Sequence, residues 1–344
     1  MIESPTSSGK KISSGSFDPS NSLLGVGARW CLNYSMRVLI VGCGYLGVAV
    51  GSELVRQGHQ VFGMRRSPEA ASTLAAAGIQ LIIADVSQPA SLAAVPNDFD
   101  WVISTLAPSG HTVEDYRAIY LDGTRHLLAW LGTRPPKKFL HTSSTSVYGQ
   151  NDGSVVKETS PTTPESSTAK ILVETEQLLL QAAQETQFPA IILRVAGIYG
   201  PDRCQLLEHF IHNTTRLSPD GRRVINLIHR DDLVITQIGI LKSGRAGEIY
   251  NAVDDEPVSE LHLYQWLAES LGKYMPPFAT LAEEAARTRR ITNKKVSNRR
   301  LKMEIGCVFK YPTFRQGYTA EIKRMDQAGL LDFEPESRDH LSAD

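Results

Sequence analysis

The chain has 344 residues, of which 42% are hydrophobic and 21% are charged, a length typical of about two structural units of roughly 150 residues each. Its 36 Lys and Arg residues balance 37 Asp and Glu residues and leave a formal net charge of −1. This balance excludes a whole-protein electrostatic attraction to nucleic acid or to an anionic membrane. The four cysteines form no C-x-x-C pair, which predicts reduced thiols in a cytoplasmic protein rather than a disulfide framework or a zinc site.

The first 35 residues differ in composition from the rest of the chain. Ser, Gly, Pro and Asn recur in them without apolar periodicity, which predicts a flexible tail over residues 1–35. The charged-then-apolar order of a signal peptide is not found there. The longest apolar run, Val38 to Val50, is interrupted by three glycines and is too short to span a bilayer.

From Met36 onward, short apolar runs alternate with helical patterns. Strands that are apolar throughout are typical of a parallel sheet covered on both faces. The alternation therefore predicts an α/β fold, a Rossmann-type doubly wound parallel sheet with a smaller C-terminal substrate lobe. The expected strands are Val38–Val41, Gln60–Met64, Gln80–Ala84, Asp100–Ser104, Lys138–Thr142 and Ala190–Val195, and the expected helices are Leu46–Gln57, Pro68–Ala77, Val113–Leu131 and Thr168–Gln187.

The pattern becomes looser after about Gly200. We expect a dinucleotide-binding Rossmann domain over residues 36–195. Residues 196–330 are expected to form mainly the substrate lobe, interleaved with the Rossmann core, and residues 331–344 a second tail. The short apolar run Glu248–Asn251 is assigned to the smaller unit.

A glycine-rich turn follows the first strand. The sequence Gly42-Cys43-Gly44-Tyr45-Leu46-Gly47 has the G-x-G-x-x-G spacing at a strand-to-helix turn, the context in which such a loop binds a pyrophosphate. Gly42 would make the turn, Gly44 would admit the phosphates, Gly47 would let the helix pack on the strand, and the amides of Tyr45 and Leu46 lie at the helix start. The alternative is a glycine-rich turn that binds no ligand.

The end of the second strand favours NADP over NAD. NAD-binding proteins usually place an acidic residue about 20 residues beyond the glycines, where it binds the ribose hydroxyls. Arg65 and Arg66 occupy that place here, and guanidinium groups can hold a 2′-phosphate. The alternative is a pair of solvated surface arginines. Asp85, at the end of the third strand, is expected to accept from the adenine amino group or, alternatively, to cap the next helix.

Five segments of the chain resemble the extended short-chain dehydrogenase/reductases, the NAD(P)-dependent epimerase/dehydratase family, and they follow one another in the same order as in that family. The late segment Lys295–Leu301, with Tyr311 and Pro312, is similar to the atypical, YeeZ-like branch. The resemblance implies an oxidoreductase or epimerase/dehydratase acting on a small hydroxyl- or carbonyl-bearing substrate, such as a sugar or nucleotide sugar, and a homodimer. The matching segments are Gly42–Gly47, Ser143–Gly149, Leu193–Pro201, Ile228–Asp232 and Gly247–Asn251.

The resemblance also assigns catalytic residues, with one departure. Members of the family use a Tyr four residues before a Lys as the acid–base pair and a Ser that binds the substrate oxygen. The Ser matches Ser144, with Ser146 beside it, and the Lys matches Lys170, which can also hold the nicotinamide ribose. At the Tyr position this chain has Ser166, and an aliphatic hydroxyl is a far weaker acid than a phenol, whose pKa is about 10.

Three explanations of this departure stay open. Another tyrosine acts as the acid or base, with Tyr120 as the sharpest candidate and Tyr148 and Tyr199 as residues that also fit a packing role. Alternatively, the chemistry needs no such base. In the third explanation the protein is a non-catalytic NADP-binding redox sensor or regulatory protein.

Candidate substrate contacts follow from the same resemblance. Arg194 and His229 match segments near the substrate cleft, although Arg194 also fits an ion pair with a carboxylate. The basic residues between Arg287 and Lys302 fit a phosphate-bearing substrate or a solvated charged face. Without interleaved aromatic residues they do not suggest nucleic acid. His209 and His212 are three residues apart but have no third ligand in reach by sequence, so no metal site is expected.

Overall fold

The computed structural model describes residues 35–286 and 292–331. The chain divides into a unit of residues 1–34 and a unit of residues 35–344, and every described residue belongs to the second unit. The tails expected at 1–35 and 331–344 lie outside the described residues except for Ser35 and Leu331.

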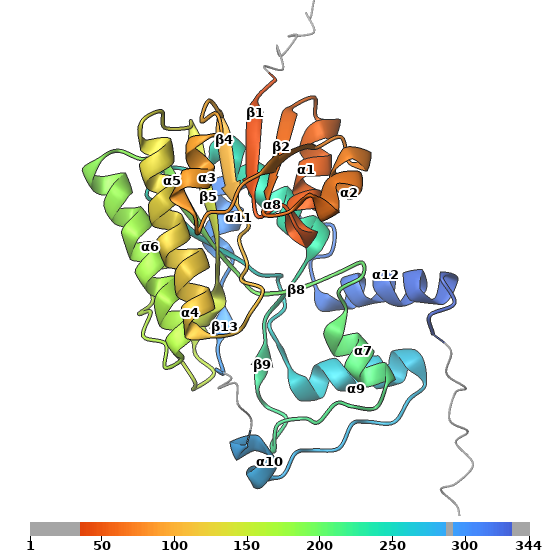
Figure 1. Ribbon diagram of the computed structural model, residues 1–344. Helices are drawn as coiled ribbons and strands as arrows, with labels where there is room; N and C mark the ends of the chain where they lie inside the picture. Colours follow the sequence, from red (N-terminus) through yellow and green to blue (C-terminus); the bar gives the residue numbers. More distant parts are fainter. Residues whose placement is uncertain (1–34, 287–291, 332–344) are drawn as a thin grey trace, which may run out of the picture. The chain divides into compact units, whose positions relative to one another are not determined.

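A parallel seven-stranded sheet forms the centre of this unit (Figure 1). Its strand order is β11-β7-β5-β4-β1-β2-β3, which confirms the predicted Rossmann-type doubly wound fold. The order reverses between β1 and β4, and in such sheets ligands bind at this point, beyond the carboxyl ends of the strands. The strands are β1 (Arg37–Val41), β2 (Gln60–Arg65), β3 (Gln80–Ile83), β4 (Trp101–Ser104), β5 (Lys138–Ser144), β7 (Ala190–Val195) and β11 (Ile249–Ala252).

Helices cover both faces of the sheet. On one face, apolar residues of α1, α2, α8 and α11 share a buried cluster with inward-facing strand residues; on the other, α3, α5 and α6 do so. The bounds are α1 (Tyr45–Arg56), α2 (Ala71–Ala76, preceded by the 3₁₀ turn η1, Pro68–Ala70), α3 (Pro89–Ala93), α5 (Gly123–Gly132), α6 (Ser167–Glu185), α8 (Arg230–Ser243) and α11 (Arg299–Ile305).

The helix expected over Val113–Leu131 is interrupted. It consists of α4 (Val113–Tyr116), a π-helical segment η2 (Arg117–Asp122) and α5. Sequence periodicity did not indicate the wider turn, because every residue in it is compatible with an ordinary α-helix. π-helical turns of this kind are rare and occur frequently at functional sites.

The smaller lobe is built from short elements with their own apolar cluster, which includes Tyr199, Phe210, Tyr264 and Phe314. Three two-stranded sheets, β8–β10, β9–β12 and β6–β13, accompany it. The bounds are β6 (Val155–Val156), β8 (Gly197–Tyr199), α7 (Gln205–Ile211), β9 (Val224–Ile225), β10 (Leu227–His229), β12 (Val258–Ser259), α9 (Glu260–Leu271), α10 (Leu281–Ala285), β13 (Lys295–Val296) and α12 (Phe314–Gln327), and the 3₁₀ turn η3 is Thr145–Val147.

The strand assigned to the smaller unit lies elsewhere. It is β11, which pairs in parallel with β7 at the edge of the main sheet. Because β11 and α8 both follow residue 195, the Rossmann sheet and its covering layer need chain from beyond that boundary.

Candidate functional site

The glycine loop joins β1 to α1 in a tight turn. Gly42 has a φ of +80°, and a Cβ there would lie 3.0 Å from the Leu106 Cα. A Cβ on Gly47 would lie 3.0 Å from the Ile40 Cγ2, so α1 packs closely on β1. Helix α1 has no acidic residue in its first turn and no side-chain cap. Its amide N–H groups and its partial positive charge are therefore available to an anion.

Two arginines lie at the end of β2 beside this loop: Arg65 is the last residue of the strand and Arg66 follows it. The Arg65 Nη1 donates to the Cys43 carbonyl at 3.1 Å, and it lies 3.3 Å from the place that a Cβ on Gly44 would take. The Arg66 Nη2 donates to the Ser109 Oγ at 2.6 Å and thereby links the loops after β2 and β4. Arg65 also lines a groove of about 1090 Å³ that runs from the glycine loop between α1, α2 and α8.

Asp85 takes part in a local turn. Its Oδ1 accepts from the Ser87 backbone N–H at 2.9 Å and from the Ser87 hydroxyl at 2.8 Å. The cap position of the next helix, α3, is occupied by Gln88, so Asp85 is not the N-cap. Its Oδ1 is engaged locally, and the adenine contact stays a prediction.

The second half of the chain reaches the glycine loop through Tyr45. Its hydroxyl donates to the Pro201 carbonyl at 2.9 Å. The guanidinium groups of Arg203 and Arg230 each lie 5.5 Å from the centroid of the Tyr45 ring, a favourable cation–π distance. Sequence reasoning missed both arginines, since no motif spacing connects residues 203 and 230 with residue 45.

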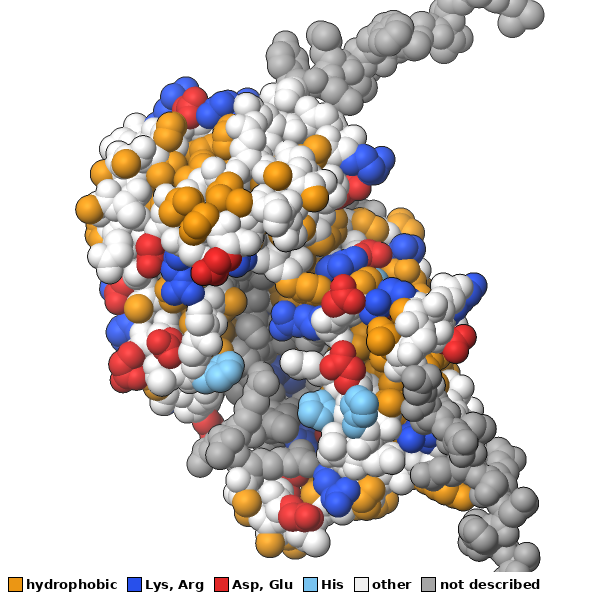
Figure 2. All heavy atoms as spheres, turned by 45° about the vertical axis from the view of Figure 1, so that its right-hand side comes forward, with side chains coloured by type: hydrophobic (Ala, Val, Ile, Leu, Met, Phe, Trp, Pro, Cys, Tyr) orange, Lys and Arg blue, Asp and Glu red, His pale blue; other side chains and the backbone are white. Residues whose placement is uncertain are grey.

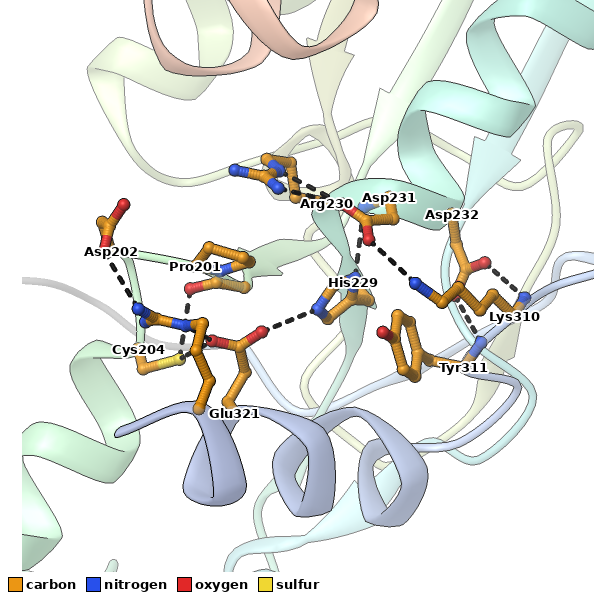
Figure 3. A network of polar contacts seen from close by, with 12 residues as sticks. Pro201, Asp202, Cys204, His229, Arg230, Asp231, Asp232, Lys310, Tyr311 and Glu321 are labelled. Carbon is orange, nitrogen blue, oxygen red and sulfur yellow. Dashed lines mark hydrogen bonds and ion pairs between the residues drawn. The ribbon is translucent and has the colours of Figure 1, made fainter. Parts of the chain in front are cut away.

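His229 lies in a polar network that joins β10, the start of α8 and α12 (Figure 3). Its Nδ1 accepts from the Asp231 backbone N–H at 3.1 Å, so in the neutral ring the proton is on Nε2, which donates to the Glu321 Oε1 at 3.2 Å. The Arg324 Nε donates to the other oxygen of Glu321 at 2.9 Å. Burial alone would raise the pKa of the Glu321 carboxyl group, but the hydrogen bonds from His229 and Arg324 outweigh this effect and lower the pKa.

Within this network the His229 side chain is not placed to contact a substrate directly. The His229 side chain is only 1% exposed, and both of its ring nitrogens are bonded within the protein. Cys204, at the same network, donates to the Gly200 carbonyl at 3.2 Å, and burial raises the pKa of its thiol to about 12. The network therefore fixes the loop that contacts Tyr45.

The end of β5 presents two partly exposed serines. The Ser144 Oγ accepts from the Ser146 backbone N–H at 3.1 Å, which fixes the turn after the strand. The preceding residue of the strand, Ser143, points to the opposite face and donates to the Glu176 Oε1 at 2.5 Å. Ser144 thus faces away from this buried acid.

Helix α6 begins immediately after Ser166. Ser166 is its N-cap residue, with an exposed side chain whose hydroxyl bonds to the Thr168 hydroxyl at 2.8 Å. Lys170 is exposed one turn further on, and its backbone N–H donates to the Ser166 carbonyl at 3.0 Å. Lys170 lines a hollow of about 420 Å³ together with Thr162, Thr163, Pro164, Val173 and Glu174.

Tyr120 lies on the π-helical segment η2. Burial raises the pKa of its phenol to about 12, so the phenol is protonated near neutral pH. Its ring packs against a cluster that contains Val147 and Leu172, which come from the η3 turn after β5 and from α6. The contact places Tyr120 beside a cluster to which the turn after β5 and helix α6 both contribute.

Arg194 forms the ion pair considered as its alternative role. Its Nη2 lies 2.7 Å from the Glu176 Oε2, and the two side chains are only 4% and 3% exposed. Its Nη1 donates to the Tyr148 hydroxyl at 2.9 Å, which in turn donates to the Asn251 Oδ1 at 2.8 Å. Arg194 and Tyr148 are therefore held in a buried network between β7, α6 and β11.

Tyr199 packs within the smaller lobe. It stacks on Tyr318 with ring centroids 4.6 Å apart and is 2% exposed. Burial, with Asp254 nearby, raises the pKa of its phenol above the usual range. This arrangement agrees with the packing role expected as one interpretation.

The late basic run is only partly described. Arg287, Arg289 and Arg290 lie outside the described residues. Arg300 pairs with Glu248 and Glu304, and Lys302 with Asp255. On the face in Figure 2, positive and negative side chains are interspersed.

Two further findings concern metals and membranes. In the described part of the chain, no group of three or more His, Cys, Asp or Glu side chains is placed to hold a metal ion. The His209 Nδ1 bonds instead with the Thr214 hydroxyl at 2.9 Å. Among the helices of residues 35–286 and 292–331, none is long and apolar enough to cross a membrane.

Comparison with known proteins decides the family. The model of the NAD dependent epimerase/dehydratase family matches residues 38–252, which include the glycine loop, the Ser144 strand and β11. The chain belongs to this family. It is 29% identical over 284 residues to Protein YeeZ of Escherichia coli (strain K12), a match that covers 80% of this chain and 96% of YeeZ.

Solved structures agree with this assignment. A putative NAD-dependent epimerase/dehydratase from Methylobacillus flagellatus is 30% identical, with a TM-score of 0.69, and the match covers 85% of this chain and 99% of that one. The dTDP-glucose 4,6-dehydratase of Bacillus anthracis, solved in complex with NAD, shares the fold with a TM-score of 0.73 at 19% identity, over 85% of this chain and 97% of that one. Membership of an NAD-dependent epimerase/dehydratase family supports a function of the oxidoreductase, epimerase or dehydratase kind.

Proposed function

We propose that this member of the family is an NADP(H)-dependent oxidoreductase or epimerase/dehydratase acting on a small hydroxyl- or carbonyl-bearing substrate, such as a sugar or nucleotide sugar. The observation that carries the proposal is the pair of arginines after β2. Arg65 lies against Gly44 of the glycine loop, and Arg66 reaches Ser109. The turn Gly63–Ser67 contains no acidic residue that would repel a 2′-phosphate.

The glycine loop fits the pyrophosphate of a dinucleotide. Its helix start has no competing carboxylate in the first turn. The nearest atom to the Cβ position of Gly44 is the tip of a flexible arginine, Arg65, at 3.3 Å. Arg203, whose guanidinium lies 5.5 Å from the centroid of the Tyr45 ring, adds positive charge from the side of the smaller lobe. Arg230 lies at the same ring and is paired with Asp231 at 3.1 Å. These residues would hold the phosphates, and Lys170 would hold the nicotinamide ribose.

The proposed chemistry is transfer of a hydride, which a bound nicotinamide supplies or accepts. Ser144 would bind the substrate oxygen. Because burial holds the pKa of Tyr120 near 12, its phenol suits the donation of a proton to an oxygen better than the removal of one. With the protonated Tyr120 phenol as the proton donor, the proposed direction is the reduction of a carbonyl group.

Titration with NADP⁺ and NAD⁺ tests the cofactor. We expect NADP⁺ to bind more tightly, and Arg65→Gln with Arg66→Gln to lower NADP⁺ affinity about tenfold or more while leaving NAD⁺ affinity nearly unchanged, since charge-assisted bonds contribute about 1.5–3 kcal/mol each. Arg134→Gln, an exposed arginine after α5, is the matched control. Equal affinity for both cofactors would overturn the preference.

A second function is favoured by Ser166, because the first turn of α6 presents no phenol beside Lys170. In this case the protein binds NADP(H) without turnover, as a redox sensor or regulatory protein. Incubation with NADPH and a panel of sugars, aldehydes and ketones separates the two. NADPH oxidation supports the enzyme, and tight binding without oxidation on the whole panel supports the sensor.

A further inference from the structure

A layer of polar side chains lies inside the protein beside Tyr120. Ser104 at the end of β4 and His141 in β5 are neighbours in the register of the sheet. Val102 and Phe139, two residues earlier on each strand, belong to the cluster under α5 and α6. Because alternate residues of a strand face the same side, Ser104 and His141 continue this face toward the carboxyl edge of the sheet.

Thr124 comes to the same layer from the helix above. It lies one turn before Leu127 and two before Leu131, which pack in that cluster, and one turn after Tyr120. Residues three and four apart share one helix face. The rings of Tyr120 and His141 have centroids 6.5 Å apart at 83°, so Tyr120 borders this layer.

These three side chains are buried without partners. Ser104, Thr124 and His141 are each 0% exposed, and no described atom bonds to the Ser104 Oγ, the Thr124 Oγ1 or either ring nitrogen of His141. A helical threonine commonly bonds to a carbonyl one turn back, a bond that does not form here, where the π-helical segment precedes Thr124. Each unpaired buried polar group lowers the stability of the fold by about 1–3 kcal/mol. A bound partner that forms hydrogen bonds with these four atoms would therefore stabilise the protein.

The chemistry of the layer suits a water molecule. Burial lowers the pKa of His141 to about 4, so its neutral ring offers one donor and one acceptor. The two hydroxyls can each donate or accept. Internal waters typically make about three hydrogen bonds to otherwise unpaired buried groups, and this set provides that number.

We propose that Ser104, Thr124 and His141 bind an internal water molecule behind Tyr120, and that this hydrated layer positions the Tyr120 phenol as the proton donor that α6 does not supply. The positioning role rests on the proposed function. In that role the phenol would give its proton to a carbonyl oxygen whose carbon accepts the hydride that a bound reduced nicotinamide would supply. The products are the alcohol, the oxidised nicotinamide and a phenolate, which regains its proton from solvent.

High-resolution crystal structures test the water directly. The wild type is expected to show a water molecule within hydrogen-bond distance of Ser104, Thr124 and His141, and the double variant Ser104→Ala, Thr124→Val is expected to lack it. An empty layer in the wild type, or side chains paired with one another, would overturn the proposal. Ser104→Ala removes a hydroxyl group and Thr124→Val replaces one with a methyl group, and thermal melting checks that the variant is folded.

The positioning of Tyr120 has its own readout. With ¹³Cζ-labelled tyrosine, NMR titration follows the Tyr120 phenol, which Tyr120→Phe identifies. Loss of the water removes a polar neighbour of the phenolate, so the double variant should titrate at higher pH than the wild type. The control Thr236→Val, a buried threonine of α8, should leave the signal unchanged. An unshifted titration in the double variant contradicts the positioning role.

NADP⁺ binding by the same proteins separates this inference from the proposed function. A wild type that holds the water but binds no NADP⁺ contradicts the proposed function and leaves the water site intact. A wild type that binds NADP⁺ but lacks the water contradicts only the water site.

Discussion

At the residue scale, the buried pair of Arg194 and Glu176 gives a sharp stability prediction. Glu176→Gln leaves the Arg194 guanidinium buried without a compensating charge, and breaking such a pair costs about 3–5 kcal/mol. Glu174, on the same helix, pairs with Arg117 at a site where both side chains are nearly half exposed, so Glu174→Gln should cost less than about 1 kcal/mol. Urea unfolding of the two variants measures the difference, and similar losses would contradict the structural role of the Arg194 pair.

Asp254 makes the stability of the fold depend on pH. Its side chain is 2% exposed, and burial raises its pKa to about 8, with Asp255, Glu256 and Asp232 adding to the effect of burial. In the unfolded chain the pKa is about 3.9. The native state therefore holds a proton that the unfolded state has released, and the stabilising contribution is complete below about pH 4 and is lost as the pH rises to about 8.

Asp254→Asn removes this dependence. At about pH 4 the free energy of unfolding of the variant should match that of the wild type. At about pH 8 the variant should be more stable by on the order of a few kcal/mol, since each pKa unit corresponds to about 1.4 kcal/mol. Urea unfolding at pH values of about 5 and about 8 measures both. A wild type whose advantage over the variant grows with pH would contradict the assignment.

At the scale of elements, the packing of α1 on β1 depends on a glycine. A Cβ on Gly47 would already lie 3.0 Å from the Ile40 Cγ2 and 3.1 Å from the Thr105 Oγ1. Gly47→Val should therefore destabilise the protein by about 1–3 kcal/mol and weaken NADP⁺ binding. Gly132, near the end of α5, has open space around its Cβ position, so Gly132→Val is the control and should cost well under 1 kcal/mol. Denaturant unfolding and NADP⁺ titration measure both effects.

The elements around this loop were predicted well from the sequence. Periodicity placed β1, α1 and β2 within one or two residues of their bounds, because apolar runs and glycines determine them locally. The π-helical segment before Thr124 has no such local signal. The place of β11 was predicted wrongly because four residues carry no information on which sheet they join.

The residues of the candidate site likewise fall into a group that the sequence could predict and a group that it could not. The loop Gly42–Gly47 and the arginines after β2 follow one another in the chain, so spacing could find them. Arg203 and Arg230 lie at Tyr45 only through tertiary packing. The buried polar layer of Ser104, Thr124 and His141 likewise brings together residues of three elements, β4, α5 and β5, whose spacing in the sequence does not connect them.

At the scale of the whole molecule, the Rossmann unit is completed by chain that follows the smaller lobe's first elements. The cluster beneath α1 contains Val234 and Ile238 of α8, Tyr250 of β11 and Leu301 of α11, together with Val50 of α1. A fragment of residues 36–195 loses these partners and also exposes the edge of β7, which β11 covers. An exposed strand edge favours aggregation.

We therefore predict that residues 36–195 alone do not form a stable, NADP⁺-binding domain, although they contain the glycine loop, Arg65, Arg66, Ser144 and Lys170. Residues 35–331 should unfold in one cooperative transition, because the same strands contribute residues to the buried clusters on both faces of the sheet. Circular dichroism, limited proteolysis and NADP⁺ titration of the two chains measure this. A shorter fragment that unfolds cooperatively and binds NADP⁺ would show that α8 and β11 are accessory to a self-sufficient domain. Its failure to fold would place the boundary of the cofactor domain beyond β11.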